Sequence, residues 1–260
     1  MAEEQGLNGA DQARRFGGVG RLYGEAAAQR FAAAKVCVVG IGGVGSWVAE
    51  ALARSAVGQL TLIDLDMVAE SNANRQIHAL DPVWGMAKVE AMRARILAIN
   101  PACEVRCVED FVTPENLAEL LGGHDLIVDA IDQTRVKVAM AAWCVAQGVP
   151  LVMAGGAGGK QDPALICSAD LSRTEQDPLL ARVRAQLRKE HGFPKDPKRK
   201  FGITAIYSRE PLQRPVVCES GDPADAPQGL SCAGYGSAVC VTAPFGFFAA
   251  AAALRLLTQV

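Results

Sequence analysis

The sequence has few cysteines, and their spacing excludes two common uses of this residue. Eight cysteines among 260 residues are too sparse for a scaffold held together by disulfides. No two of them form a C-x-x-C pair, and the closest spacing is Cys103-x3-Cys107 within an apparent strand. A structural zinc site is therefore not expected, and reduced thiols in a cytoplasmic protein are the simplest interpretation.

The N-terminus lacks an apolar stretch that could serve as a secretion signal, and no repeat of fixed period is visible. One long apolar run does occur, over residues 237–257, and its roughly 20 residues are enough to span a bilayer. Pro244 and Gly246 interrupt this run and Arg255 lies near its end. We expect a buried helix in a cytoplasmic protein, with membrane association as the minor alternative.

A strong excess of positive charge is absent as well. The chain has 26 Lys and Arg against 28 Asp and Glu, a net charge of −2, which excludes a uniformly basic nucleic-acid binder. The charge is uneven, because residues 182–200 carry a net +6 and the remainder −8. This basic segment is typical of contact with a phosphate backbone, and equally of a solvated lysine-rich surface.

The composition indicates a globular protein, and the order of its expected elements indicates an α/β fold. Hydrophobic residues make up 50% and charged residues 21%, so the chain can bury a sizeable core. Because the expected strands alternate with helices, the pattern predicts βαβ units and a parallel sheet. Strands are expected over 35–40, 59–66, 104–109, 125–132, 150–155, 163–171 and 201–208. After a polar leader, helices are expected over 24–34, 84–99, 134–147 and 177–191, at the C-terminus, and after Thr113 as an N-cap.

A glycine-rich turn joins the first expected strand to a helix. Gly40, Gly42 and Gly45 match G-x-G-x-x-G, and Gly43 lies within the motif. Such a turn lets the backbone approach a phosphate, which the N–H groups of the helix N-terminus can bind. Asp64 ends the next strand, where a ribose hydroxyl would lie. The motif and its context predict a nucleotide site.

The residues beyond Asp64 favour ATP over NAD. Arg75 is suited to a triphosphate, Lys88 adds a second positive charge, and Asp132 could hold Mg²⁺ against the phosphates. A dinucleotide rarely requires two extra cations and a carboxylate. The alternative is a solvated loop with incidental charges.

Several segments together resemble the ubiquitin-activating-like adenylating family: GIGGVGS, LIDLDMVAESNANRQ, AKVE and DAID. The chain is more similar still to one branch, the tRNA threonylcarbamoyladenosine dehydratases, through RFGGVGRLYGE, NANRQIHAL, DFVTPENL, GGAGGKQDP, TEQDPLLARVR and SCAGYGSA. The activators of sulfur-carrier proteins in this family often have two C-x-x-C pairs, and their absence here argues against that sub-branch.

The resemblance implies a fold and a site. The fold is a Rossmann-like, doubly wound, mostly parallel sheet with helices on both faces, in one adenylating domain. Its nucleotide-binding part covers about residues 15–155 and its substrate-facing part about 156–260. Asp64 would bind the ribose and Asp132 Mg²⁺, and the phosphates would be held by Gly40, Gly42, Gly43, Gly45, Asn72, Arg75, Gln76 and Lys88. The residues assigned to the chemistry are Arg75, Asp132 and Cys232.

The implied activity is ATP-dependent dehydration of threonylcarbamoyladenosine next to the tRNA anticodon, through adenylation of its carboxylate. The alternatives are activation of a small carrier protein and, far less favoured, an NAD-dependent oxidoreductase. The resemblance also implies a homodimer in which Arg15 or Arg21 reaches the partner's site. The resemblance leaves two further interactions open: a cysteine desulfurase sulfur-transfer system as a protein partner, and a bound monovalent cation (Na⁺ or K⁺).

The thiols and imidazoles divide into one functional candidate and several structural ones. Cys232 follows a Pro/Gly loop and precedes a helix, so a helix-end dipole would favour its thiolate, although a buried core thiol is the alternative. We expect Cys37 and Cys144 to be core residues. His78 and His124 are expected to be structural.

Overall fold

The computed structural model describes residues 4–196, 198–213 and 235–259, and the side chains from Gln12 onward. The strands are β1 (Lys35–Val39), β2 (Gln59–Ile63), β3 (Glu104–Val108), β4 (Leu126–Asp129), β5 (Leu151–Ala154), β6 (Ile166–Asp170) and β7 (Thr204–Ser208). The α-helices are α1 (Glu4–Tyr23), α2 (Glu25–Ala33), α3 (Gly45–Arg54), α4 (Lys88–Ile99), α5 (Leu117–Leu121), α6 (Thr134–Gln147), α7 (Pro178–Glu190) and α9 (Val239–Leu257). Short 3-10 helices are η1 (Glu70–Asn72), η2 (Pro163–Leu165) and η3 (Leu171–Arg173).

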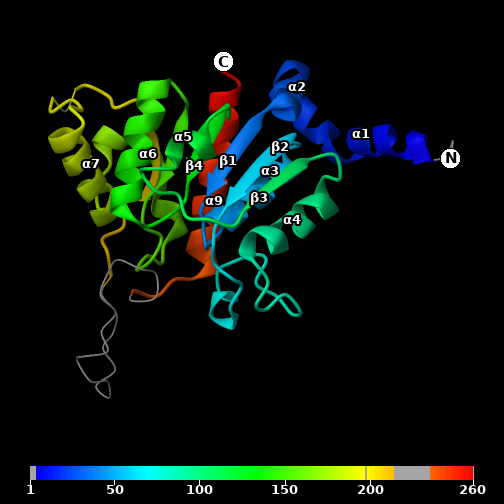
Figure 1. Ribbon diagram of the computed structural model, residues 1–260, viewed down its shortest axis with the longest axis horizontal. Coiled ribbons are helices and arrows are strands. Elements are labelled where there is room, and N and C mark those ends of the chain that lie inside the picture. The colour runs from blue at the N-terminus through cyan, green and yellow to red at the C-terminus, as the bar shows by residue number, and fades with distance from the viewer. Residues whose placement is uncertain (1–3, 197, 214–234, 260) are drawn as a thin grey trace.

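The strands form a sheet in the order β3-β2-β1-β4-β5-β7-β6 (Figure 1). All neighbouring pairs are parallel except β6 and β7, which are antiparallel. The expected nucleotide-binding and substrate-facing parts share this sheet, because β5 from the first pairs with β7 from the second. The predicted mostly parallel, doubly wound sheet is confirmed.

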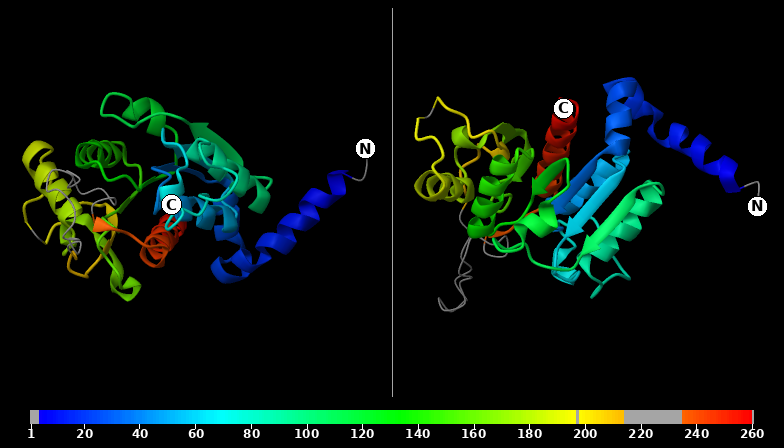
Figure 2. Two further views of the ribbon diagram at one scale, coloured as in Figure 1. Left: turned by 90° about the horizontal axis from the view of Figure 1, so that it is seen from below. Right: turned by 45° about the horizontal axis from the view of Figure 1, so that its top comes forward.

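Both faces of the sheet are covered, which explains why its central strands are apolar on both sides. In β1, Val36 and Val38 pack into a core with α2, α3, α4 and α9. Cys37 and Val39 point to the other face and pack with α5, α6 and α7. Figure 2 shows these helical layers on either side of the sheet.

The C-terminal apolar run forms α9, as expected, and packs closely on α3. A Cβ atom on Gly246 would lie 2.6 Å from the Cβ of Trp47 and 2.8 Å from the carbonyl oxygen of Val44, so glycine permits this approach. By length and composition, α9 is the one helix of the described residues that could cross a membrane, but 56% of its apolar window is buried inside the protein. The predicted helix is therefore confirmed, and more than half of its apolar window is buried.

Three local expectations were wrong. The polar leader is helical: it forms α1, which ends at Tyr23 and contacts the C-terminal end of α4 through Arg15 (Figures 1 and 2). The helix expected from Trp84 begins at Lys88, after an isolated bridge between Met67 and Ala87. Thr113 is not an N-cap: α5 begins at Leu117, and the Oδ1 of Asn116 accepts the Thr113 N–H at 2.8 Å.

Candidate active site

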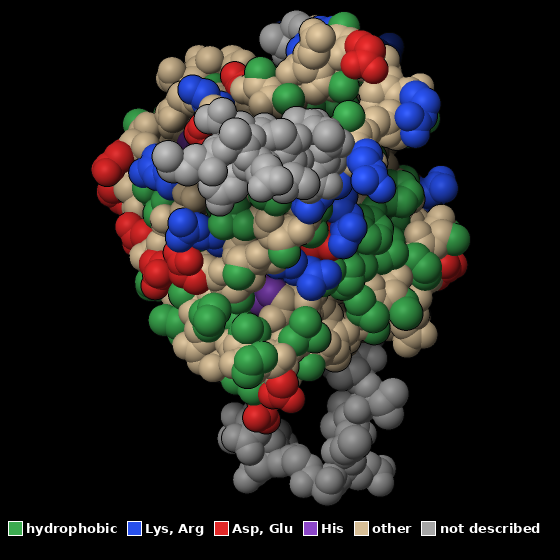
Figure 3. Space-filling model, turned by 90° about the vertical axis from the view of Figure 1, so that its right-hand side faces the viewer, with side chains coloured by type: hydrophobic (Ala, Val, Ile, Leu, Met, Phe, Trp, Pro, Cys, Tyr) green, Lys and Arg blue, Asp and Glu red, His purple; other side chains and the backbone are tan. Residues whose placement is uncertain are grey.

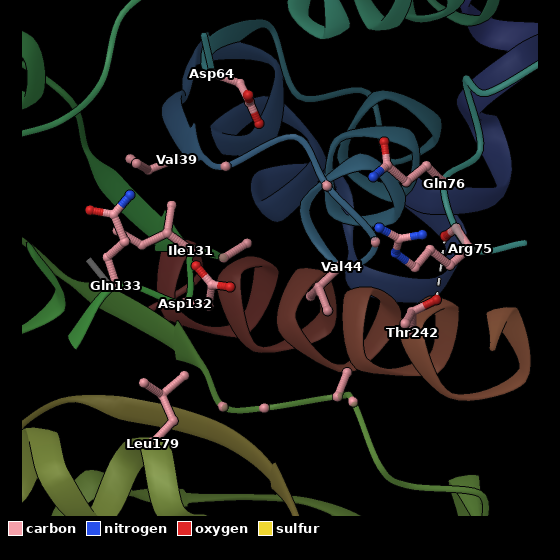
Figure 4. A pocket seen from close by; sticks show the side chains of 18 of the residues that line it. Val39, Val44, Asp64, Arg75, Gln76, Ile131, Asp132, Gln133, Leu179 and Thr242 are labelled. Atoms are coloured by element: carbon pink, nitrogen blue, oxygen red, sulfur yellow. Dashed lines mark hydrogen bonds between the residues drawn. The ribbon is translucent and has the colours of Figure 1, made fainter. Parts of the chain in front are cut away.

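A cavity of about 350 Å³ opens at the carboxyl ends of β1, β2, β4 and β5. The strand order reverses between β1 and β4, and open α/β sheets bind ligands in the crevice beside such a reversal. Figure 4 shows Asp64, Arg75 and Gln76 on one side of the cavity, Leu179 on the other, and Asp132 between them. Most residues that the sequence predicted for the nucleotide site therefore lie together.

The glycine turn between β1 and α3 depends on missing side chains. Gly40 has a φ of 87°, in the left-handed region that favours glycine. A Cβ atom on Gly45 would lie 1.8 Å from the carbonyl oxygen of Gly40, so Gly45 shapes the turn from beneath, outside the cavity lining. Gly42 lines the cavity, and no protein atom lies within 4 Å of where its Cβ would be. A ligand can therefore approach the backbone at Gly42.

Asp64 connects the end of β2 to this turn. Its Oδ2 accepts the backbone N–H of Ile41 at 2.6 Å, and its Oδ1 accepts that of Asp66 at 2.9 Å. The carboxylate also lines the cavity. Because a carboxylate has about four lone-pair sites, Asp64 can hold the turn and still accept hydrogen bonds from a ligand's hydroxyl groups.

Two cations lie on the same side of the cavity. The Nη1 of Arg75 donates to the carbonyl oxygen of Ser71 at 2.7 Å and to the Oδ1 of Asn74 at 3.0 Å, so its guanidinium is positioned without a carboxylate partner in these bonds. The Nζ of Lys88, whose side chain is 8% exposed, pairs with the Oδ2 of Asp66 at 2.6 Å. Both residues line the cavity, together with the carboxylates of Asp64 and Asp66.

Gln76 and Asn72 are both buried, but only Gln76 lines the cavity. Among the described residues, nothing pairs with the Oε1 of Gln76, and its side chain faces the glycine turn in Figure 4. The Oδ1 of Asn72 instead accepts the backbone N–H of Ala69 at 3.1 Å. Asn72 thus shapes the turn that carries Arg75 and does not reach the cavity itself.

Asp132 is exposed within the cavity, at the end of a segment fixed by a buried ion pair that the sequence analysis missed. The Nζ of Lys137 lies 2.8 Å from the Oδ1 of Asp129 and donates to the carbonyl oxygen of Ile131 at 2.9 Å. Burial raises the pKa of Asp129, and the charge of Lys137 opposes that rise. Lys137 lies among apolar residues on α6, and only the register of that helix on the sheet reveals its burial.

The far side of the cavity is built by a second network that the sequence did not reveal. The buried Asp177 caps α7 by accepting the Leu180 N–H at 2.9 Å, and it accepts the Gly156 N–H at the same distance. Burial raises the pKa of Asp177. Lys160 also lines this side and is 4% exposed. The sequence did contain one signal for Lys160: it follows the buried strand β5 by a few residues, much as Asp64 follows β2.

Neither histidine singled out from the sequence lines the cavity. The Nε2 of His124 lies 2.9 Å from the Oγ1 of Thr61, and its Nδ1 lies 3.0 Å from the carbonyl oxygen of Leu121. His78 is 3% exposed, and neither ring nitrogen has a hydrogen-bond partner among the described residues. Burial, with the nearby charge of Lys88, lowers the pKa of His78 to about 4.

The expected core cysteines are buried. Cys37 and Cys144 are both 0% exposed. Burial raises the pKa of both thiols, that of Cys144 to about 12, so neither is a thiolate at neutral pH. Cys232 lies outside the described residues.

Few of the described side chains near the cavity could hold a metal ion. No group of three or more His, Cys, Asp or Glu side chains that could hold a metal occurs in the described part of the chain. Mg²⁺, however, commonly takes only one or two carboxylates together with substrate phosphates. Asp132 in the cavity, opposite Arg75 and Lys88, fits such a site.

The basic segment extends away from the cavity. Pro178 and Leu179, at the start of α7, line the cavity, whereas Lys198–Lys200 follow the other end of this 13-residue helix (Figure 1). The C-terminal part of the segment therefore does not share a face with the glycine turn, which favours the solvated-surface alternative.

Comparison with known proteins gives consistent matches over nearly the whole chain. The family described as the ThiF family matches residues 18–260. The tRNA threonylcarbamoyladenosine dehydratases of Escherichia coli and Haemophilus influenzae are 50% and 48% identical, covering 93% and 91% of this chain and 92% and 90% of theirs. The crystal structure of the E. coli enzyme in complex with ATP has a TM-score of 0.87 at 47% identity and covers 97% of each chain.

Proposed function

The chain belongs to the ThiF family, and from that premise we propose that it is an ATP-dependent tRNA threonylcarbamoyladenosine dehydratase. One observation carries the proposal. The similarity to dehydratases extends over 93% of the chain, including the substrate-facing part. The cavity supports ATP as the nucleotide, because two cations and an exposed carboxylate lie beside its glycine turn. The structure of the E. coli relative in complex with ATP supports the same nucleotide.

The chemistry overcomes a poor electrophile by adenylation. A carboxylate oxygen of the threonylcarbamoyl group attacks the α-phosphorus of ATP, the bond to the β-phosphate oxygen breaks, and pyrophosphate leaves. The carbamoyl group then attacks the activated acyl carbon, the bond to AMP breaks, and a proton passes to solvent. The net change in the nucleoside is loss of water and formation of a ring.

The residues on the glycine-turn side would bind ATP. The backbone at Gly40, Gly42 and Gly43 would hold the phosphates at the N-terminus of α3, with Gly45 shaping the turn. Asp64 would bind the ribose, while Arg75, Gln76 and Lys88 would hold the phosphates. The partnerless Oε1 of Gln76 supports this assignment, because a buried amide is normally hydrogen-bonded and a rotated amide offers its N–H groups to a phosphate. Asn72 would act through the turn that carries Arg75.

Asp132 would hold Mg²⁺ against the phosphates. The ion supplies neutralisation of the charge that develops as pyrophosphate leaves. The exposed position of Asp132 in the cavity supports this role, and the Asp129–Lys137 pair would keep the preceding residue in place. Arg75 would stabilise the same charge from the opposite side.

We propose that the enzyme is a homodimer with sites completed in trans. Arg15 and Arg21 lie on α1, and neither lines the chain's own cavity. α1 contacts α4 through Gln12 and Arg15, whose Nη1 donates to the carbonyl oxygen of Ile99 at 2.9 Å. Figure 3 shows Lys and Arg beside apolar side chains on this face of the molecule.

Four further assignments remain predictions from the sequence. Cys232 would accept the acyl group as a thioester before ring closure. A cysteine desulfurase sulfur-transfer system would be a partner, and a monovalent cation, Na⁺ or K⁺, would bind. Because the proposed substrate is tRNA, we place the enzyme in the cytoplasm.

The direct test is pyrophosphate release from ATP by the purified enzyme. We expect release with tRNA that contains threonylcarbamoyladenosine, with stoichiometric cyclic nucleoside and AMP, and none with the unmodified transcript. Release with a carrier protein ending in Gly-Gly, and none with modified tRNA, would support carrier-protein activation instead.

A further inference from the structure

The cavity has two sides of different character. The glycine-turn side carries Arg75 and Lys88, whereas the other side is built by residues 155–158, 177–179 and Leu212 (Figure 4). Lys160 is the positively charged residue that lines this second side in the described part of the chain. Because ATP is assigned to the first side, the second side remains for the substrate nucleoside.

Lys160 is buried, and two of the three N–H donors of its ammonium group form hydrogen bonds. Its Nζ donates to the carbonyl oxygen of Gln176 at 3.1 Å and to the carbonyl oxygen of Glu210. Both acceptors are neutral, and an ammonium group has three N–H donors. These two bonds therefore fix the direction of the ammonium group and leave one donor for a ligand in the cavity.

The carboxylates near Lys160 are occupied by other donors. Asp177 accepts the N–H groups of Gly156 and Leu180. Glu210 accepts the N–H groups of Gln161 at 2.9 Å and Asp162 at 3.0 Å. Their charges favour the ammonium form of Lys160, but burial is the larger influence and lowers its pKa. Burial of a cation without a direct ion pair is unfavourable unless an anion joins it.

We infer that Lys160 binds the carboxylate of the threonylcarbamoyl group and directs it toward ATP. This inference rests on the proposed function. The carboxylate must approach a triphosphate, and two anions repel each other at short range. A fixed ammonium on the substrate side offsets that repulsion, as Arg75 and Lys88 would for the phosphates. Lys160 would thus select the modified nucleoside, since unmodified adenosine has no carboxylate.

The test compares the affinity for tRNA with and without threonylcarbamoyladenosine, in the presence of α,β-methylene ATP, which cannot release pyrophosphate. We expect the wild-type protein to prefer the modified tRNA by about tenfold or more, the usual contribution of a hydrogen bond to a charged group. Lys160→Met should reduce this preference to less than about twofold, with unchanged affinity for the unmodified tRNA and the ATP analogue. Lys160→Gln, which can still donate to a carbonyl, provides the same comparison if the methionine variant does not fold.

Two controls separate recognition from support of the cavity wall. Lys189→Met removes an exposed lysine from α7 and should keep the preference. Glu210→Gln loosens the network around Lys160 but keeps its ammonium group, and should also keep the preference. The inference is overturned if Lys160→Met retains the preference, or if Glu210→Gln loses it to the same extent. No preference in the wild-type protein, together with no release of pyrophosphate from ATP in the presence of modified tRNA, would instead overturn the proposed function.

Discussion

Lys137 and Asp129 form an ion pair whose Nζ–Oδ1 distance is 2.8 Å, and both side chains are 0% exposed. The Oδ1 of Asp129 also accepts the backbone N–H of Ile131 at 3.2 Å, while Lys137 binds the carbonyl oxygen of the same residue. The pair therefore clamps the residue that precedes Asp132 from both of its backbone polar groups.

Removing one partner of this pair should destabilise the fold. Lys137→Met leaves the Asp129 charge buried alone, so we expect the free energy of unfolding to fall by about 3–5 kcal/mol. The double variant Asp129→Leu, Lys137→Met should recover most of the loss, because an apolar pair leaves no buried charge. Urea unfolding measures both. Arg135→Ala is the control, since its pair with Glu115 spans 3.9 Å and Arg135 is 84% exposed. Equal stability of Lys137→Met and wild type would contradict this account.

His78 should make the fold sensitive to mild acid. Its pKa is lowered to about 4 in the folded protein, whereas the unfolded chain has the ordinary value of about 6.5. The contribution of His78 to stability is therefore present above pH 6.5 and is lost as the pH falls toward 4. Between pH 7 and pH 5 the wild-type protein should lose about 2 kcal/mol more than His78→Asn. Parallel pH profiles of unfolding free energy for the two proteins would show that His78 does not titrate in this way.

Asp132→Ala should change the metal dependence of pyrophosphate release. Loss of a carboxylate ligand weakens Mg²⁺ in the cavity, so the half-saturating Mg²⁺ concentration should rise by about tenfold or more. Because Asp132 is exposed, thermal stability should stay close to that of wild type. Asp110→Ala, which alters another carboxylate of the cavity lining, is the matched comparison. An unaltered Mg²⁺ titration would remove Asp132 as a ligand.

Mixing two inactive variants tests whether an arginine acts across a dimer. We expect Arg75→Ala alone to be inactive. We also expect one of the two single variants Arg15→Ala and Arg21→Ala to be inactive, namely the one that removes the arginine reaching the partner's site. In a mixed dimer, one site then has both arginines intact and the other has neither. Random subunit exchange should therefore restore about a quarter of wild-type activity. No recovery with either arginine, or an active monomer in sedimentation, would rule out sites completed in trans.

Cys232→Ser distinguishes a thioester route from direct ring closure. Serine is similar in size but is a far weaker nucleophile at neutral pH. If a thioester is obligatory, the variant should release pyrophosphate yet form almost no cyclic nucleoside. We expect this loss of product, measured by nucleoside mass spectrometry in single turnover. Product formation at nearly the wild-type rate would remove the assigned role, and aggregation of the variant would favour a core thiol.

The parts of the fold that could be predicted are those where local sequence and tertiary structure agree. The buried strands, the glycine turn and α7 follow from apolar runs and their spacing. α1 was expected only as a polar leader, and its 20 residues include five glycines, which are unfavourable in a helix interior. Asn116, and not Thr113, precedes the first residue of α5. The Oδ1 of Asn116 accepts the Thr113 N–H, a contact that spacing does not reveal.

The same distinction holds for the site. The placement of Asp64 and Asp132 beside one cavity was predictable because parallel strands bring their carboxyl ends to one edge of the sheet. Arg75 and Lys88, which follow β2 along the chain, line the same cavity. Lys137 and Lys160 were not predictable, because the burial of a lysine depends on which carbonyl and carboxylate oxygens surround it in the folded chain. Asn72 belongs to the predicted cluster but is turned to the backbone of Ala69.

The central claim is that this protein forms the cyclic nucleoside in tRNA, and it is tested most directly in cells. Nucleosides of bulk tRNA from cells with and without the gene should be compared by mass spectrometry under mild, neutral conditions. The account predicts that the cyclic form disappears and uncyclised threonylcarbamoyladenosine accumulates, and that the wild-type gene, but not Arg75→Ala, restores the cyclic form. Persistence of the cyclic nucleoside at its normal level in cells without the protein would contradict the account.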